Sequence, residues 1–320
     1  MGEVVEQILS RLCISYEENV DLSLKTWLKT GGKVKYWVKP DTIDKLRFLI
    51  QELNDRNIRY DVVGHTSNIY FLDSYCPFII ISTIKLCGFS DNGKILYCEC
   101  GTPVSRLSSY SIEKGYKGFY GLVNLPGTVA AAVVNNSSCF DCCLSEQIIE
   151  ITYIDLCTNE LKVLLRDELG LRFRNSFFKE KEIQGVILSV KLLINEGTPE
   201  EEKQKADEAK MIRKETQEAP AYTLGSVFAG LKAKQTIHVR ICEIIEGALR
   251  RMGLLTKSRS IMIKLLLFGF LDLKPFISQR NINTFIWLPK RKDKHDKFKR
   301  YLQFVNTIYD NPRMEIEVRG

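Results

Sequence analysis

The chain has 320 residues, of which 45% are hydrophobic and 27% charged, and this balance excludes a collagen-like, coiled-coil or largely disordered protein. Of the net charge of +7, residues 290–300 supply +5, because they hold seven basic and two acidic residues. Apolar residues recur at helical spacing directly behind this basic segment, so we interpret it as the solvated face of a packed helix. No aromatic or glycine-rich module accompanies the charge, so we expect no nucleic-acid partner.

The first residues are acidic and lack the basic segment and long apolar core of a secretory signal, so we expect a cytoplasmic protein. The longest apolar stretch, residues 260–277, is interrupted by Lys264, Asp272 and Lys274. It falls short of the roughly 20 apolar residues that a membrane-spanning helix needs, so we expect no span.

Ten cysteines are expected to be thiols in that compartment. Cys98 and Cys100 alternate within an apolar run, which predicts two small buried side chains on one face of a strand. Cys139, Cys142 and Cys143 form a C-x-x-C-C cluster that suggests redox or zinc chemistry. However, no second cysteine pair stands at ligand spacing and the chain has three histidines, so we expect no metal site.

The first part of the chain predicts a β-α-β unit after a short amphipathic helix. Residues 34–38 alternate as a strand that stops at Pro40, and Asp41 is expected to cap the following helix. A second strand is expected at residues 59–63. It leads directly into a turn of small, hydrogen-bonding residues: Gly64, His65, Thr66, Ser67 and Asn68.

The middle of the chain alternates strand patterns with a helix. Strands are expected at residues 78–82, 95–100, 149–156, 161–165 and 186–194. A helix is expected at residues 103–114, closed by Gly115. The single helices between pairs of strands favour an α+β fold over a doubly wound sheet.

A charged helix is predicted to bridge two parts of the molecule. Thr198 as N-cap, Pro199 at the first helical position and Glu201 three residues after the cap predict a helix that ends near residue 214. Beyond it we expect a strand at residues 283–288, the basic helix, and a final strand at residues 314–318.

The usual nucleotide-binding motifs are missing, since the chain has neither G-x-G-x-x-G after its first strand nor a P-loop. Two other segments present small residues whose backbone N–H groups can approach a phosphate closely: residues 64–68, and residues 126–132 with the sequence PGTVAAA. Taken singly, the first is also typical of a β-turn and the second of a closely packed helix start.

Short motifs in a fixed order extend along most of the chain. They are LKTW (24–27) with Gly31 and Gly32, VGHTSN (63–68) with Asp73, GFYG (118–121) through LPGTV (125–129) with Asn135, FRNS (173–176), RKETQ (213–217), GSVF (225–228) and EIEVR (315–319). The series resembles the UDP-N-acetylenolpyruvoylglucosamine reductase family, FAD enzymes that are also called UDP-N-acetylmuramate dehydrogenases and make a peptidoglycan precursor.

The resemblance implies an α+β fold with a two-part FAD-binding domain of the vanillyl-alcohol-oxidase and p-cresol-methylhydroxylase type and a smaller α+β substrate-binding cap. We expect the two FAD-binding subdomains at residues 1–85 and 86–197. The cap is expected at residues 198–320, with its C-terminal strand returning to the active site. Arg174 and Ser226 are 52 positions apart, which is similar to the spacing in the shorter class of these reductases.

The resemblance also assigns the binding residues. The FAD site is expected to comprise Gly64, His65, Thr66, Ser67, Asn68, Gly101, Pro126, Gly127, Thr128, Val129, Asn135 and Ile187. Substrate binding is expected at Arg213, Gln217 and Asn283.

In the family, NADPH reduces the flavin, and the reduced flavin passes hydride to the enolpyruvyl group of a UDP-sugar. Negative charge then spreads onto the adjoining carboxylate. By resemblance, Arg174 pairs with that carboxylate, Ser226 protonates the neighbouring carbon, and Glu317 is the second acid. Without the motifs, a surface ion pair, a turn hydroxyl and an exposed terminal acid are the ordinary interpretations of these three residues.

The sequence therefore predicts a cytoplasmic, monomeric FAD- and NADPH-dependent reductase of a UDP-sugar enolpyruvyl ether. Several positions depart from the family pattern: Ala130 and Ala131 replace glycines, Ala229 replaces a lysine and Asn281 replaces a histidine. These departures favour an alternative, a catalytically impaired FAD-binding paralogue with an accessory role in surface-polysaccharide synthesis. A third hypothesis, an FAD oxidase of another alcohol, gives the three catalytic candidates no shared role.

Overall fold

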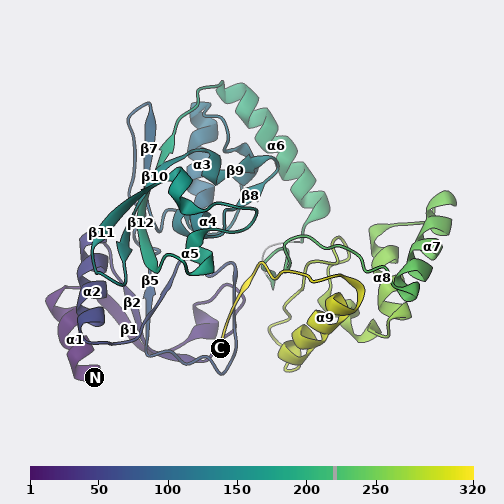
Figure 1. The fold of residues 1–320 in the computed structure, drawn as a ribbon, viewed down its shortest axis with the longest axis horizontal. Coiled ribbons are helices and arrows are strands. Elements are labelled where there is room, and N and C mark those ends of the chain that lie inside the picture. Colours follow the sequence, from purple (N-terminus) through teal and green to yellow (C-terminus); the bar gives the residue numbers. More distant parts are fainter. Residues whose placement is uncertain (219–221) are drawn as a thin grey trace. The chain divides into compact units, whose positions relative to one another are not determined.

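The computed structural model describes residues 1–218 and 222–320, which form two compact units (Figure 1). Unit 1 comprises Met1–Leu24, Gly32–Thr66 and Tyr75–Met211. Unit 2 comprises Lys25–Gly31, Ser67–Ser74 and Ile212–Gly320. Each unit is described by itself, and the predicted division of the first 197 residues into two FAD-binding subdomains stays a prediction.

A four-stranded sheet forms the first layer of unit 1. Its strands, in spatial order, are β1 (Ser15–Asp21), β2 (Lys33–Lys39), β5 (Ile79–Ser82) and β3 (Asp61–Val63). Both β2 and β3 run parallel to β5, so the predicted β-α-β unit is confirmed, with β5 between its two strands. Helices α1 (Gly2–Arg11) and α2 (Ile43–Asp55) share one apolar core with this sheet.

One detail of this unit differs from the prediction. The α2 helix is capped by Thr42, whose side chain accepts a hydrogen bond from the N–H of Lys45. Asp41, the predicted cap, instead forms an ion pair with the Lys45 side chain. Because aspartate and threonine are both good N-caps and stand side by side here, the sequence pattern does not decide between them.

The second sheet of unit 1 has five antiparallel strands. In spatial order they are β11 (Leu161–Leu165), β10 (Ile148–Asp155), β12 (Gly185–Leu193), β7 (Ile95–Glu99) and β6 (Phe89–Asp91). The predicted hairpin of β10 and β11 is confirmed. Cys98 and Cys100 are fully buried, as predicted. Among the described residues, no group of three or more His, Cys, Asp or Glu side chains is arranged to hold a metal ion.

Short helices lie beside this sheet. They are α3 (Val104–Lys114), α4 (Val129–Val134) and α5 (Phe177–Glu180), beside the small hairpin of β8 (Ser138–Cys139) and β9 (Cys142–Cys143). Gly115 ends α3 in the left-handed conformation, as predicted. The charged helix α6 (Pro199–Thr216) begins with the predicted bond from the N–H of Glu201 to Thr198 Oγ1, and unit 1 ends within it.

Unit 2 contains helices α7 (Ile237–Arg251), α8 (Lys257–Leu267) and α9 (Lys294–Ile308), and strands β4 (Ile69–Phe71) and β13 (Glu317–Arg319). The basic segment leads into α9, whose apolar face is buried, so that prediction is confirmed. The predicted strand at residues 283–288 is wrong. This segment forms isolated bridges at Thr284 and Phe285, because its backbone bonds go to several different segments. In residues 1–218 and 222–320, no helix is long and apolar enough to cross a bilayer.

Candidate functional site

Two of the small-residue loops lie against each other in unit 1. The 64–66 loop follows β3, and the 126–129 loop leads into α4. A Cβ atom added to Gly64 would lie 2.7 Å from Thr128 Oγ1, so this approach requires glycine. His65 also hydrogen-bonds to the backbone of Gly127. The structure therefore brings together four residues that the sequence predicted to share one cofactor.

The His65 side chain is partly buried where these two loops meet. Burial lowers the pKa of His65 below its ordinary value of 6.5, although the bond to Gly127 opposes this shift. The imidazole is therefore neutral at pH 7, and it can accept as well as donate a hydrogen bond.

The 126–129 loop has fewer available N–H groups than its composition indicates. The N–H groups of Val129 and Ala130 donate to the carbonyls of Thr102 and Cys100, at 2.9 and 3.2 Å. The N–H of Ala131 donates to Thr128 Oγ1 at 3.4 Å. These three donors are committed to protein acceptors, which leaves the N–H groups of Gly127 and Thr128 as the phosphate-binding candidates of this loop.

Two residues of the predicted flavin site, and one position that departs from the family pattern, belong to the packing of unit 1. A Cβ atom on Gly101 would lie 1.9 Å from the carbonyl oxygen of Thr83, so Gly101 permits two backbone segments to pass closely. Ile187 is buried in the apolar core. Ala130 packs against both apolar cores of unit 1, so its methyl group contributes to core packing.

Arg174 is held on a tight turn beside the end of α4. Residues 172 and 175 exchange two backbone hydrogen bonds of 3.1 and 3.0 Å, and Arg174 between them has a φ of 55°. Its guanidinium carbon lies 5.7 Å from the ring centroid of Phe173. Ser176 donates to the carbonyl of Val134 at 2.7 Å, which fastens the turn to α4.

Lys179 connects Arg174 to Asn135. Its ammonium group donates to Asn135 Oδ1 at 2.9 Å and to the Arg174 carbonyl at 3.3 Å. The structure thus brings together a predicted catalytic residue and a predicted flavin residue. Lys179 was not among the site residues predicted from the sequence. The available signal was Ser176, whose side chain caps the short helix α5 that carries the lysine.

Ser226 lies on an extended segment of unit 2 with partners on both sides. On one side the N–H of Val227 donates to the Asn283 carbonyl, and on the other the N–H of Glu315 donates to the Val227 carbonyl, both at 2.8 Å. The side-chain amide of Asn283 accepts from the N–H of Phe228 and donates to the Phe228 carbonyl, at 2.9 and 2.7 Å. Asn283, predicted to bind substrate, therefore fixes the backbone next to Ser226.

Glu317 lies next to the last residues of the predicted flavin loop. Strand β13 runs parallel to β4 with Glu317 opposite Ile69, and the N–H of Glu317 donates to the Asn68 carbonyl at 2.9 Å. The Asn68 amide donates to the Glu315 carbonyl at 3.3 Å. The Glu317 carboxylate forms an ion pair with Arg319 at 2.7 Å. This arrangement brings Glu317 and Asn68 together within unit 2.

A chain of hydrogen bonds through Tyr70, His295 and Asp73 connects strand β4 to helix α9. The buried Tyr70 hydroxyl of β4 hydrogen-bonds to Nδ1 of His295 in α9, and Nε2 of His295 lies 2.6 Å from Asp73 Oδ2. Burial raises the pKa of Tyr70, so its hydroxyl stays protonated. His295 was missed in the sequence, where it stands inside the basic segment.

The remaining predicted residues lie in α6 and just beyond it. Arg213 donates to Gln217 Oε1 at 2.9 Å, one helical turn further on. Arg280 donates to the carbonyls of Lys214 and Gln217, both at 2.7 Å, and so closes the end of this helix. Of the three catalytic candidates, Ser226 and Glu317 belong to unit 2 and Arg174 to unit 1. Their convergence stays a prediction.

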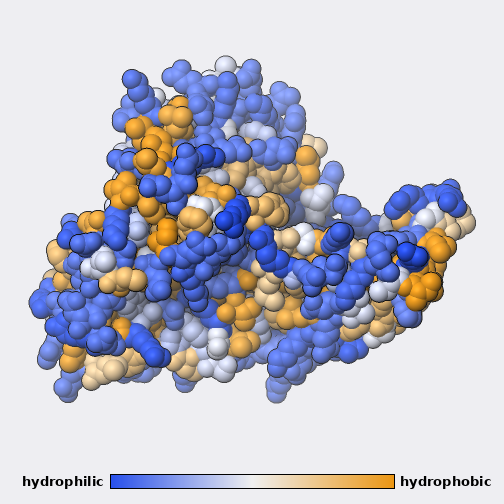
Figure 2. All heavy atoms as spheres, in the orientation of Figure 1, coloured by the Kyte–Doolittle hydropathy of each residue, from blue (hydrophilic) through white to orange (hydrophobic). Residues whose placement is uncertain are grey.

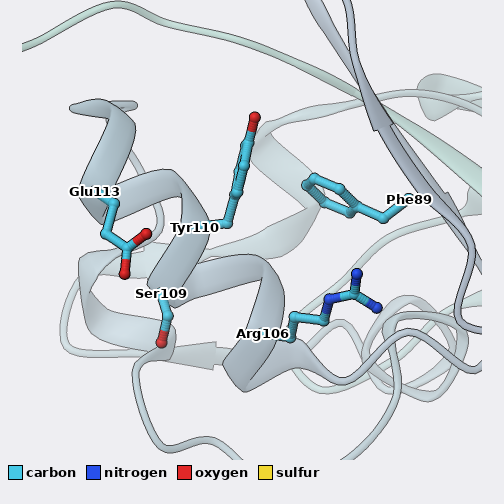
Figure 3. Close-up of a pocket in the computed structure, with 5 residues that line it drawn as sticks. All are labelled: Phe89, Arg106, Ser109, Tyr110 and Glu113. Atoms are coloured by element: carbon cyan, nitrogen blue, oxygen red, sulfur yellow. The ribbon is translucent and has the colours of Figure 1, made fainter.

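A hollow of about 320 Å³ in unit 1 is lined by other residues. Phe89, Arg106, Ser109, Tyr110 and Glu113 form its lining, along one face of α3 and the adjacent strand β6 (Figure 3). The rings of Phe89 and Tyr110 meet edge to face at 4.8 Å. None of these five residues belongs to the predicted cofactor or substrate sets.

Comparison with known proteins agrees with this geometry. The sequence pattern of the FAD binding domain family matches residues 34–163, which include both loops that meet at Gly64 and Thr128. A UDP-N-acetylenolpyruvoylglucosamine reductase of Caldicellulosiruptor bescii is 30% identical over 225 residues, which cover 70% of this chain and 71% of the relative. The chain belongs to the UDP-N-acetylenolpyruvoylglucosamine reductase family. The predicted family resemblance is therefore confirmed, and the protein is a flavin oxidoreductase of this type.

Other members of the UDP-N-acetylenolpyruvoylglucosamine reductase family show the same likeness. The Prochlorococcus marinus reductase is 28% identical and covers 70% of this chain and 78% of its own length. The crystal structure of the Thermus caldophilus enzyme superimposes with a TM-score of 0.67 at 19% identity, and it covers 96% of this chain and 99% of that one. The α+β FAD-binding fold predicted from the sequence is thus confirmed.

Proposed function

We propose that the protein uses NADPH and bound FAD to reduce the enolpyruvyl group of UDP-N-acetylglucosamine enolpyruvate, or of a related UDP-sugar, as in the synthesis of a peptidoglycan precursor. The contact between the 64–66 and 126–129 loops, inside the segment that matches the FAD binding domain family, carries this proposal. The names of the relatives supply the substrate class.

The residues present fit a dinucleotide. The Gly64–Thr128 approach removes side-chain bulk at the point where the loops meet, and the Gly127 and Thr128 N–H groups are candidate donors to its phosphates. The expected lining within unit 1 also includes His65, Thr66, Asn135 and Gly101, which follows the end of β7. When bound, the flavin supplies the hydride-transfer chemistry that protein side chains cannot perform.

The protein's own residues are proposed to bind and orient the enolpyruvyl ether. The Arg174 guanidinium pairs with the substrate carboxylate, where negative charge develops, and removal of such a contact costs about 2.7 to 4 kcal/mol of barrier height. The Ser226 hydroxyl donates the proton that the adjacent carbon receives, and Glu317 polarises the carboxylate. Arg213 and Gln217 are proposed to contact the UDP-sugar, while Asn283 holds the Ser226 segment in place.

The experiment that tests this proposal follows the visible absorbance of bound flavin. Purified protein is mixed with NADPH without oxygen, and UDP-N-acetylglucosamine enolpyruvate is then added. We expect NADPH to bleach the flavin band and the enolpyruvyl ether to restore it. Flavin that is bleached but never restored by any UDP-sugar enolpyruvyl ether contradicts the proposed substrate.

Two variants separate the roles of the residues. Ser226→Ala is expected to keep the bleaching by NADPH and to lose the restoring step, because its hydroxyl acts in the second half of the reaction. Ser138→Ala, a serine in the short strand β8, serves as the control and is expected to keep both steps. An equal loss of both steps in Ser226→Ala removes the proposed role of Ser226.

The same measurement identifies the alternative. An FAD-binding paralogue with an accessory role is favoured by Ala229 and Asn281, which replace a lysine and a histidine of the family pattern. Such a protein is expected to hold flavin and to show no turnover with NADPH and the enolpyruvyl ether. A cytoplasmic location and a monomeric state stay predictions, which fractionation and sedimentation test.

A further inference from the structure

Helices α7 and α8 form an antiparallel hairpin in unit 2. The Glu246 carboxylate of α7 contacts Lys264 of α8 and accepts a hydrogen bond of 2.6 Å from Ser260. At the other end, the rings of His238 and Phe268 lie 6.4 Å apart. Thr236 and Thr256 cap the two helices, so both starts are well defined.

The α7–α8 hairpin and the few residues after it are unusually rich in exposed apolar side chains. In the described part of the chain, eight of the 22 exposed large hydrophobic residues fall within residues 237–271, about a tenth of its length. They are Ile237, Ile241, Ile244, Met252, Leu254, Leu266, Leu267 and Leu271. Figure 2 shows apolar atoms gathered over α7.

The apolar residues of α7 form a stripe. Ile237, Ile241 and Ile244 are separated by four and three positions, so they share one helix face. Ile237 and Ile244 are 65% and 71% exposed, whereas Val239 and Cys242 on another face of the helix are buried. The helix therefore already has a packed face, and its isoleucine stripe is a second apolar face in water.

Basic residues flank this stripe. Residues 236–267 contain six Lys and Arg residues against two Glu residues, a net charge of +4. Glu246 is occupied by Lys264. Five cationic side chains of the hairpin are exposed: Arg240, Arg250, Arg251, Lys257 and Arg259. This charge opposes the docking of a second copy of the same hairpin and complements an anionic surface.

We propose that the α7–α8 hairpin binds the surface of a membrane that contains anionic lipids, a role that goes beyond the proposed reductase activity. The isoleucine stripe lies at the boundary of the acyl chains and the arginines lie at the lipid headgroups. An exposed aliphatic stripe with a net charge of +4 around it is the pattern of a helix that lies on an anionic membrane surface, which favours a lipid as the occupant.

The test uses the full-length protein and lipid vesicles in a sedimentation assay. We expect the protein to sediment with vesicles of phosphatidylcholine and phosphatidylglycerol in equal parts, and to bind vesicles of phosphatidylcholine alone at least about tenfold less tightly. Added salt is expected to release it, because exposed charges are screened. No binding to the anionic vesicles overturns the proposal.

Paired variants test the two components of the surface. Ile241→Glu with Ile244→Glu, and separately Arg250→Glu with Arg251→Glu, are each expected to weaken vesicle binding at least about tenfold. The matched controls carry the same changes elsewhere: Val163→Glu with Leu165→Glu on β11, and Lys203→Glu with Lys210→Glu on α6. These controls are expected to bind as the parent protein does.

Flavin absorbance and circular dichroism establish that each variant folds. Vesicle binding that the hairpin variants leave unchanged assigns the interaction to another surface and overturns the proposal. A dimer of the parent protein that Ile241→Glu with Ile244→Glu converts to a monomer identifies a second copy as the occupant, which also overturns it. Failure of reductase activity does not bear on this result, because the assay measures binding alone.

Discussion

Two pairs of glycines, one pair in each unit, differ in how closely the rest of the chain approaches them. In unit 1, a Cβ atom on Gly64 or Gly101 would lie 2.7 Å or less from an atom of another segment. In unit 2, no atom outside the neighbouring residues and the helix backbone lies within 4 Å of the Cβ position at Gly225 or Gly247. In unit 1, segments that are distant in the sequence therefore approach each other closely at Gly64 and Gly101, and the glycines themselves are the sequence signal of this approach.

Unit 2 is instead organised around aromatic side chains. Trp287 is buried, and its ring centroid lies 4.3 Å from that of Tyr70, 4.9 Å from Phe285 and 5.0 Å from Phe298. Its segments are joined by isolated bridges and side-chain hydrogen bonds, such as those of Asn283. Unit 1 therefore follows local sequence patterns, whereas unit 2 depends on individual side-chain contacts.

The largest expected effect tests the aromatic core of unit 2. Trp287→Ala is expected to lower the free energy of unfolding by about 3 to 5 kcal/mol, because it leaves a cavity among three rings. Urea unfolding followed by circular dichroism measures this change. Phe48→Ala, at an exposed phenylalanine of α2, is the control and is expected to change stability far less. Equal effects of both variants contradict the aromatic-core interpretation.

The next prediction concerns the close backbone approach in unit 1. Gly101→Ala places a methyl group 1.9 Å from the Thr83 carbonyl oxygen, and backbone shifts of this kind cost about 1 to 3 kcal/mol. We expect a lower melting temperature and reduced flavin content. Gly247→Ala in α7, where no atom crowds the Cβ position, is expected to be neutral or slightly stabilising. A neutral Gly101→Ala removes the contrast between the units.

The Lys179 contacts offer a sharper test at the site. Lys179→Met removes the donors to Asn135 and to the Arg174 carbonyl, so we expect the Arg174 turn to loosen, with a loss of about 1.5 to 3 kcal/mol in transition-state stabilisation. The kcat/KM value for the enolpyruvyl ether measures this loss, with flavin content unchanged. Lys203→Met on exposed α6 serves as the control. Unchanged kcat/KM in Lys179→Met shows that the turn holds its position without the lysine.

The smallest expected effect is a pH dependence at His65. Its pKa in the folded protein is lowered by burial, so the unfolded chain binds the proton more tightly than the folded one. Its contribution to stability is therefore fully present above pH 6.5 and is lost as the pH falls toward the lowered folded-state value. Melting temperatures between pH 7 and pH 5 measure this change. His65→Gln is expected to flatten part of the curve, and an unchanged slope contradicts the assignment.

Much of the fold could be predicted, because its signals are local. Period-2 alternation located β2 and β7 of unit 1, Gly115 marked the end of α3, and Thr198 marked the start of α6. The prediction at residues 283–288 failed because the partners of this segment, such as Tyr222 and Phe276, differ from one residue to the next. A β-propensity pattern predicts an extended backbone, but it does not predict that one partner strand runs alongside.

The candidate site was predictable where backbone geometry demands glycine, as at Gly64. Residues that act through distant partners were not. His295 stands 225 positions from Tyr70. It was interpreted from the charge of its segment as part of a solvated helix face, and that interpretation does not predict the contact with Tyr70. Lys179 and Asn135 are 44 positions apart, and nothing in either local sequence indicates the other.

The chain passes between the two units five times, at positions 24–25, 31–32, 66–67, 74–75 and 211–212. Removal of the last 109 residues therefore does not release a self-sufficient N-terminal fragment, because β4 would lose β13, its strand partner. One of these passages falls between Thr66 and Ser67, inside the predicted flavin loop itself. Swapping caps between relatives by simple gene fusion is thus expected to fail, and recombination has to exchange all the interleaved pieces together.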